Sequence, residues 1–324
     1  MSEAIIAREL RKSYPKDVRA LDGLSLQAEA GTIFALAGPN GAGKSTTVKI
    51  LTILSRPDSG EAQVTGLDVL RYPDRVRQRI GVVGQKTGAT PEATGRENLV
   101  MQGEIYGLTG RPLRQRVEEL LERFQLRDAA DRSTKTYSGG MRRRLDVALG
   151  LVNRPEVLFL DEPTTGLDPE ARMELWQEIE RLAGDEEMTI LLTTHYLDEA
   201  DRLAGQLAIV DKGRIVAQGT PDALKSELRG DAIQVELANP SSGDRVHEAL
   251  RSLPGLSAIG LEGSTVRARA EHGASAIPTI LSALEKEGIT VASMTLARPS
   301  LDDVYLRYAG RVYHDDANGG EEAA

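Results

Sequence analysis

The chain has 324 residues, of which 40% are hydrophobic and 27% are charged, and its formal net charge is −9. This length favours one large domain with a smaller second domain, and the acidic charge argues against a nucleic-acid-binding protein. The chain has no cysteine, which excludes a disulfide framework, and no apolar run approaches the roughly 18 residues that a membrane span needs.

From about residue 4 to residue 230, short β-rich apolar runs alternate with longer helical stretches, which predicts an α/β domain. Four runs are nearly continuous in apolar residues, as strands covered on both faces of a parallel sheet should be. These runs are 32–38 (TIFALAG), 79–85 (RIGVVGQ), 157–163 (VLFLDEP) and 189–195 (TILLTTH). Residues 207–219 predict a hairpin about a Lys-Gly turn at the margin of the sheet. Helical signals replace strand signals after residue 92, so we expect a helical subdomain over about residues 92–153.

The order of elements changes after residue 230. Strand and helix signals follow one another as β-α-β-β-α-β, which predicts a small α+β domain of ferredoxin-like type over residues 231–309. Residues 300–310 (SLDDVYLRYAG) predict its last helix. The acidic residues 310–324 contain almost no large apolar side chain, so we expect a disordered tail there.

A phosphate-binding loop is predicted between the first of these buried strands and the helix after it. GPNGAGKST matches the pattern G-x-x-x-x-G-K-[ST] in that context. Backbone amides of residues 41–45 can wrap a β-phosphate, Lys44 can reach the β- and γ-oxygens, and Ser45 can bind Mg²⁺. The candidate nucleotide contacts in this loop are Gly38, Pro39, Asn40, Gly41, Ala42, Gly43, Lys44, Ser45 and Thr46.

Two carboxylates follow another buried strand, at the sheet edge where α/β proteins bind ligands. Asp161 is expected to hold the metal, largely through water, because Mg²⁺ keeps much of its hydration shell. Glu162 is expected to orient and polarise the attacking water, which indicates ATP hydrolysis as well as binding. A solvated acidic turn is the alternative for this pair.

Three single residues become candidate site residues when they are considered together with these motifs. His195 ends a buried strand, where it could contact the γ-phosphate and fix the catalytic water, although it could also be structural. Gln85 could complete the Mg²⁺ shell and report on the γ-phosphate, or be an ordinary loop residue. Tyr14 could stack on adenine through its aromatic face, or be a surface tyrosine in a proline turn.

The stretch YSGGM presents a second anion site, because Ser138, Gly139 and Gly140 precede an amphipathic helix. It has no lysine of its own. Taken in order with Tyr14, GPNGAGKST, Gln85, VLFLDEP, GLDP and His195, it resembles the signature motif of the ATP-binding cassette ATPases. The resemblance covers residues 4–230 and implies that the signature of one subunit closes over ATP held by another. It also implies that Asp168 lies at that interface, and this residue can cap the following helix as well.

A closer resemblance concerns the segments 136–169, 191–204 and 299–310, which are similar to ATP-binding subunits of daunorubicin/doxorubicin-resistance exporters. It implies the cofactors ATP and Mg²⁺, a head-to-tail homodimer, and a separate integral-membrane permease subunit as partner. The Gln85 loop and the helical subdomain would then receive a helix of that permease. The amino terminus carries no recognisable secretory signal, and we expect a peripheral protein on the cytoplasmic face of the cell membrane.

Other functions compete with this one. An importer ATPase whose carboxy-terminal domain senses the imported ligand stays open as an alternative. A nucleotide switch without hydrolysis is opposed by Glu162 and His195. Chromosome-maintenance ATPases need a long coiled coil, and ribosome-acting members usually carry two cassettes, so no nucleic-acid partner is expected. The run from Arg142 to Arg144 is accordingly interpreted as a solvated helix face.

Overall fold

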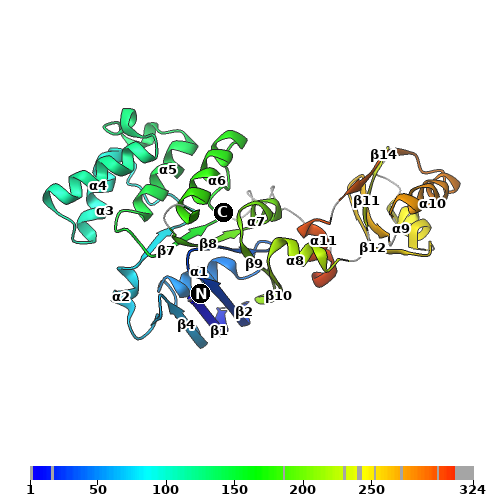
Figure 1. Cartoon of the computed structure of the whole chain (residues 1–324), viewed down its shortest axis with the longest axis horizontal. Coiled ribbons are helices and arrows are strands. Elements are labelled where there is room, and N and C mark those ends of the chain that lie inside the picture. The colour runs from blue at the N-terminus through cyan, green and yellow to red at the C-terminus, as the bar shows by residue number, and fades with distance from the viewer. Residues whose placement is uncertain are drawn as a thin grey trace. The chain divides into compact units, whose positions relative to one another are not determined.

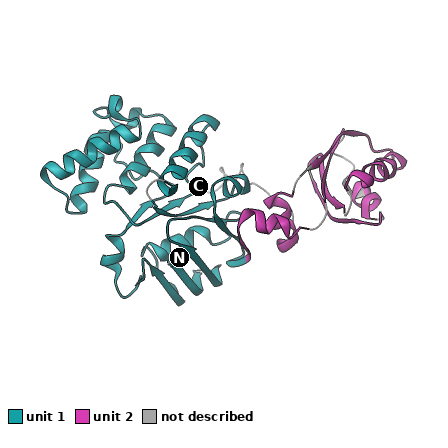
Figure 2. Cartoon of the chain, viewed as in Figure 1, with its two compact units in different colours: residues 1–215 teal, residues 216–324 magenta. Residues whose placement is uncertain are grey.

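The computed structural model describes residues 3–15, 18–184, 187–228, 231–238, 243–251, 253–270, 273–297 and 299–310. Contacts divide the chain into two compact units, residues 1–215 and residues 216–324 (Figure 2). The predicted tail beyond Gly310 lies outside the described residues. Within the described ranges, no helix has both the length and the apolar character of a membrane span.

A six-stranded sheet has the order β10-β9-β3-β8-β7-β6, and its strands lie within the first unit except for the end of β10, because that unit ends at residue 215. Its strands are β3 (Ile33–Ala37), β6 (Ile80–Val83), β7 (Val157–Asp161), β8 (Thr189–Thr194), β9 (Gln206–Asp211) and β10 (Arg214–Gly219). The four predicted buried strands are confirmed, and they pair in parallel. The predicted hairpin is confirmed as well, with β10 at the sheet margin. Every residue of β3, β7 and β8 is buried, because helices and a second sheet cover both faces.

The second sheet of this unit has the order β2-β1-β4-β5 and is antiparallel. Its strands are β1 (Glu3–Tyr14), β2 (Val18–Glu29), β4 (Ser59–Val64) and β5 (Leu67–Asp68). The buried residues of β1 and β2 face a hydrophobic core that also takes side chains from β3 and from α1 (Lys44–Leu51). The helix after the phosphate loop is thereby held between two sheets.

Helices follow between β6 and β7, where the helical subdomain is expected. They are α3 (Gly95–Ile105), α4 (Gly110–Arg123) and α5 (Gly139–Gly150), preceded by the short α2 (Pro73–Arg77). In Figure 1, α3, α4 and α5 lie together beside α6 (Pro169–Gly184). Thr94 starts α3 through a capping box with Glu97, which satisfies amides at the helix start. The short α7 (Leu197–Leu203) follows β8 directly.

The second unit contains the predicted β-α-β-β-α-β order. Its elements are β11 (Asp231–Leu237), α9 (Gly243–Arg251), β12 (Leu256–Glu262), β13 (Thr265–Ala270), α10 (Gly273–Lys286) and β14 (Val291–Ala297). The sheet order β12-β13-β11-β14, antiparallel throughout, is the ferredoxin-like arrangement and confirms the predicted fold class. Two further helices, α8 (Pro221–Ser226) and α11 (Leu301–Ala309), pack against each other.

Candidate functional site

The predicted phosphate-binding loop connects the end of β3 to the start of α1. Gly43 has a φ of 112°, and a Cβ atom there would lie 2.5 Å from the carbonyl oxygen of Ala20, so only glycine fits. Lys44 is 4% exposed, and its Nζ donates to the carbonyl oxygens of Gly38 at 2.6 Å and Pro39 at 3.0 Å. Burial lowers the pKa of Lys44, although the charges of nearby carboxylates oppose this effect. The ammonium group is thus held at the centre of the loop.

Ser45 and Asp161 come together at the carboxyl end of the central sheet. Ser45 Oγ donates a hydrogen bond to Asp161 Oδ1 at 3.0 Å, across 116 residues of sequence. Thr193 Oγ1 donates to the same oxygen at 2.6 Å. Asp161 is 8% exposed, so this hydroxyl pair fixes a buried carboxylate. The hydroxyl and carboxylate oxygens are the kind of ligand that Mg²⁺ prefers.

Glu162 lies directly beyond β7 and has a positive φ of 49°, a backbone conformation that is uncommon for residues other than glycine. Its carboxylate is 3.6 Å from Lys44 Nζ and 3.4 Å from His195 Nδ1. Burial alone raises the pKa of Glu162, but the hydrogen bond from His195 and the charge of Lys44 outweigh it. The pKa therefore lies below its ordinary value, and the group is an ionised base at neutral pH.

The remaining predicted residues of this chain's own site stand further apart. Tyr14 ends β1 and is 37% exposed, and Lys12 Nζ lies 5.7 Å from its ring centroid. Gln85 is exposed in the loop after β6. Among the residues that the structure describes, no hydrogen bond or ion pair joins Gln85 to the cluster of Lys44, Ser45 and Asp161.

The signature residues lie at the start of α5. Ser138 caps this helix, with its Oγ accepting from the amide of Met141 at 3.2 Å, and both Ser138 and Gly139 are exposed. Gly140 is half-buried. Asp168 caps α6 by accepting from the amide of Ala171 at 2.9 Å, which confirms its predicted capping role. Ser138 and Asp168 are thus exposed at the starts of their helices, and each accepts a capping hydrogen bond from the first turn of its own helix.

Three residues that the sequence patterns did not single out bond to the candidate site or to the chain next to it. Thr193 pairs with Asp161 in the β7–β8 register, and this neighbour relation was the missing signal. Glu199 is fully buried and accepts from Thr164 Oγ1 at 2.9 Å and Trp176 Nε1 at 2.8 Å. Arg143 is 7% exposed, so the interpretation of its arginine run as a solvated face is wrong at this position.

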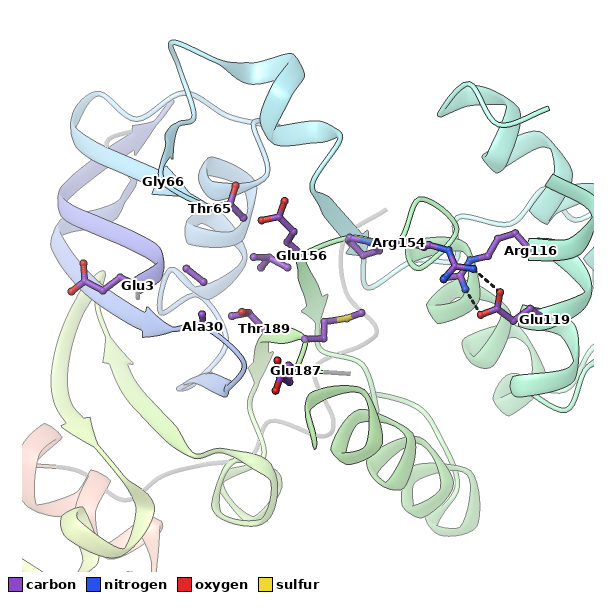
Figure 3. Close-up of a pocket in the computed structure, with 14 residues that line it drawn as sticks. Glu3, Ala30, Thr65, Gly66, Arg116, Glu119, Arg154, Glu156, Glu187 and Thr189 are labelled. Carbon is purple, nitrogen blue, oxygen red and sulfur yellow. Dashed lines mark hydrogen bonds and ion pairs between the residues drawn. The ribbon is translucent and has the colours of Figure 1, made fainter. Parts of the chain in front are cut away.

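A cavity of about 850 Å³ lies at the opposite edge of the central sheet (Figure 3). Val157 and Thr189, which line it, are the first residues of β7 and β8. Asp161 is the last residue of β7, four residues after Val157, so roughly 13 Å of strand separates the cavity from the carboxylates. The cavity is therefore distinct from the candidate nucleotide site.

Comparison with known proteins identifies the family. Residues 21–165 match the ABC transporter family, and residues 219–309 match the carboxy-terminal domain of ATP-binding proteins like DrrA1-3. The chain is 46% identical to the daunorubicin resistance ATP-binding protein DrrA2 of Streptomyces coeruleorubidus, covering 95% of each. It is 43% identical to the daunorubicin/doxorubicin resistance ATP-binding protein DrrA of Streptomyces peucetius, over 100% of this chain and 97% of that one.

A solved structure agrees with these relatives. The dimeric structure of MJ0796, a bacterial ABC transporter cassette, superposes with a TM-score of 0.62 at 25% identity, over 67% of this chain and 98% of that one. The phosphate loop, the paired carboxylates and the signature helix all fall within the matched cassette. The chain therefore belongs to the ABC transporter family, as an ATP-hydrolysing subunit of the daunorubicin/doxorubicin-resistance type.

Proposed function

We propose that this ATPase powers the export of drugs, antibiotics or other hydrophobic compounds through a separate membrane subunit. The single observation that carries the catalytic part is the position of the Glu162 carboxylate, 3.6 Å from Lys44 Nζ and 3.4 Å from His195 Nδ1, beside the phosphate loop. An ionised carboxylate in this place can orient and polarise a water molecule for attack on a γ-phosphate.

The nucleotide contacts are proposed residue by residue. The amides of residues 41–45 and the ammonium of Lys44 bind the β- and γ-phosphates, and Tyr14 stacks on adenine. Ser45 and Asp161 fit a Mg²⁺ site, since their oxygens already meet at 3.0 Å, and Gln85 completes that site. Bound Mg²⁺ neutralises charge on the phosphate oxygens. His195 orients the water together with Glu162.

The active form is proposed to be a head-to-tail homodimer closing on two ATP molecules. The signature segment contains no lysine of its own. Its helix start, formed by Ser138, Gly139 and Gly140, offers amides and a positive dipole to a γ-phosphate bound by the partner subunit. Asp168, exposed at the start of α6, couples the two sites across the same interface. The dimeric cassette that superposes on this chain supports the arrangement.

The export direction is supported by the names of the relatives and by the second unit. Its match to the carboxy-terminal domain of DrrA-like proteins disfavours an importer with a ligand sensor at this place. The partner is accordingly an integral-membrane permease, and the protein works peripherally at the cytoplasmic face of the cell membrane. No nucleic acid takes part.

Glu162→Gln tests the catalytic part. The variant should bind ATP as the parent does, because no phosphate contact is removed, but its ATPase rate should fall by about 10²–10⁴-fold. Glu61→Gln, an exposed glutamate on β4, is the matched control and should keep the parental rate. Hydrolysis by Glu162→Gln at the parental rate would show that another group activates the water.

The export part has its own test. Cells that produce the chain with its membrane subunit should accumulate less daunorubicin than cells without the pair, and Glu162→Gln should abolish the difference. Equal accumulation in cells with the pair, without the pair and with the Glu162→Gln variant would contradict drug export. If the purified protein still hydrolysed ATP, the catalytic assignment would stand.

A further inference from the structure

Arg143 and Asp146 are two buried charged residues that the proposed mechanism does not use. They lie one turn apart on α5, the helix that starts at the signature residue Ser138. Arg143 is 7% exposed and Asp146 is 6% exposed. Burying a charge is costly unless hydrogen bonds compensate it, so the partners of each residue show what the burial achieves.

Arg143 reaches two segments of the site through three nitrogens. Its Nε donates to the carbonyl oxygen of Pro163 at 2.6 Å, and its Nη2 to that of Asp161 at 3.3 Å. These two residues flank Glu162 in the chain. Its Nη1 donates to the carbonyl oxygen of Gly84 at 2.7 Å, directly before Gln85. A guanidinium spreads its N–H donors over three nitrogens in a rigid plane and can reach carbonyls on separate segments, whereas a lysine ammonium concentrates its donors on one nitrogen.

Asp146 holds the same loop from the other side of Gln85. Its Oδ1 accepts from Thr87 Oγ1 at 2.8 Å and from the amide of Gly88 at 2.9 Å. Together with the bond from Arg143 to Gly84, these contacts fix the main chain both before and after Gln85. The exposed loop is therefore anchored at two points on one helix.

The helix itself is seated tightly on the central sheet. A Cβ atom at Gly81 of β6 would lie 2.0 Å from the carbonyl oxygen of Gly150, so α5 and β6 approach closely enough to require glycine. Such close packing makes the helix, the strand and the start of the loop move as one body. A shift at the signature end of α5 thus has to reach both anchored segments.

We propose that Arg143 is a positioning residue for hydrolysis, which with Asp146 ties the Gln85 loop and the chain around Glu162 to the signature helix. This inference rests on the proposed roles of Glu162 and Gln85. In the closed dimer, the arginine sets the distance between the catalytic carboxylate and the loop that reports on the γ-phosphate. It touches neither nucleotide nor water itself.

The test compares Arg143→Gln with Arg142→Gln in the purified full-length protein. Arg142 is exposed on the same helix, so this control removes one positive charge without removing the three carbonyl bonds. For Arg143→Gln we expect kcat to fall by about 10²-fold, the loss that a displacement of about 1 Å can cause. The KM for ATP should change less than about threefold, because the phosphate loop is untouched. Arg142→Gln should keep both parental values.

Two further variants protect the test against misfolding. Arg143→Lys keeps the charge but cannot hold all three carbonyls, so its kcat should lie between those of Arg143→Gln and the parent. Thr87→Val removes an exposed hydroxyl that donates to Asp146, and it should lower kcat several-fold while preserving ATP affinity. A parental kcat in folded Arg143→Gln overturns the proposal. If that variant does not fold, a parental kcat in both Arg143→Lys and Thr87→Val overturns it. So does an equal loss in Arg142→Gln.

A double variant separates this inference from the proposed function. If Arg143 acts through Glu162, then adding Arg143→Gln to Glu162→Gln should not lower the residual rate further. A multiplied loss would show that Arg143 acts elsewhere and would overturn the proposal. Failure of Glu162→Gln to reduce hydrolysis would instead contradict the catalytic assignment itself.

Discussion

Replacing Thr193 with valine tests whether the site depends on one buried hydroxyl. Thr193 is 0% exposed, and its Oγ1 donates to Asp161 at 2.6 Å and accepts from the amide of Glu162 at 3.0 Å. That amide also donates to the carbonyl oxygen of Thr193 at 3.1 Å, so valine leaves the amide paired and removes one of the two hydroxyl donors to the Asp161 carboxylate. A hydrogen bond to a charged group contributes about 1.5–3 kcal/mol, so the free energy of unfolding should fall by about 2 kcal/mol.

The same substitution should impair hydrolysis. Asp161 retains Ser45 as donor but loses the shorter of its two hydroxyl bonds, so the carboxylate is held less firmly where the metal is expected. We expect kcat/KM for Mg-ATP to fall about tenfold or more, because small displacements at a reacting centre are costly. Urea unfolding measures the stability, and a steady-state ATPase assay on the same preparation measures the activity.

Thr189→Val is the matched control, because Thr189 starts the same strand and its Oγ1 accepts from the amide of Gly31 at 3.0 Å. It should lower the free energy of unfolding by about 1 kcal/mol and leave ATPase activity unchanged. The reasoning is refuted if Thr193→Val keeps its parental kcat/KM, or if Thr189→Val loses as much activity as Thr193→Val.

Two other predictions concern the interface and a buried carboxyl group. Ser138→Arg should abolish the ATPase activity of concentrated protein but preserve ATP binding by dilute protein, because Ser138 is exposed and its proposed contact is with nucleotide held by the other subunit; weakened binding in the dilute titration would remove the role across the interface. Glu199→Gln concerns pH: burial raises the pKa of Glu199 above its ordinary value of 4.5, against the hydrogen bonds that it accepts. Because the folded-state pKa is raised, the protonated Glu199 contributes its full stabilisation below pH 4.5. That contribution to the free energy of unfolding is lost as the pH rises through the folded-state pKa. Melting temperatures from pH 4 to pH 8 should therefore show Glu199→Gln gaining on the parent with rising pH, and a constant or shrinking difference would contradict this prediction.

The sequence by itself determined the structural elements that depend on residues close together in the chain. A contiguous strand, a glycine-rich turn and a helix specify the phosphate loop, because the residues that shape it are neighbours in the chain. Buried strands were recognisable from continuous apolar runs, and the ferredoxin-like order of the second unit from the sequence of strand and helix signals. The helix caps at Ser138 and Asp168 likewise depend on residues only three positions apart.

Only the tertiary structure decided which distant residues meet. Thr193 bonds to Asp161 because β8 lies beside β7 in the sheet. The sequence of a single strand does not determine which strands lie next to it. Arg143 looked like one charge in an exposed run, since three consecutive arginines point in different directions around a helix and their environments depend on what packs there. Its three carbonyl partners come from segments 18 to 59 residues away, so no local pattern could have revealed them.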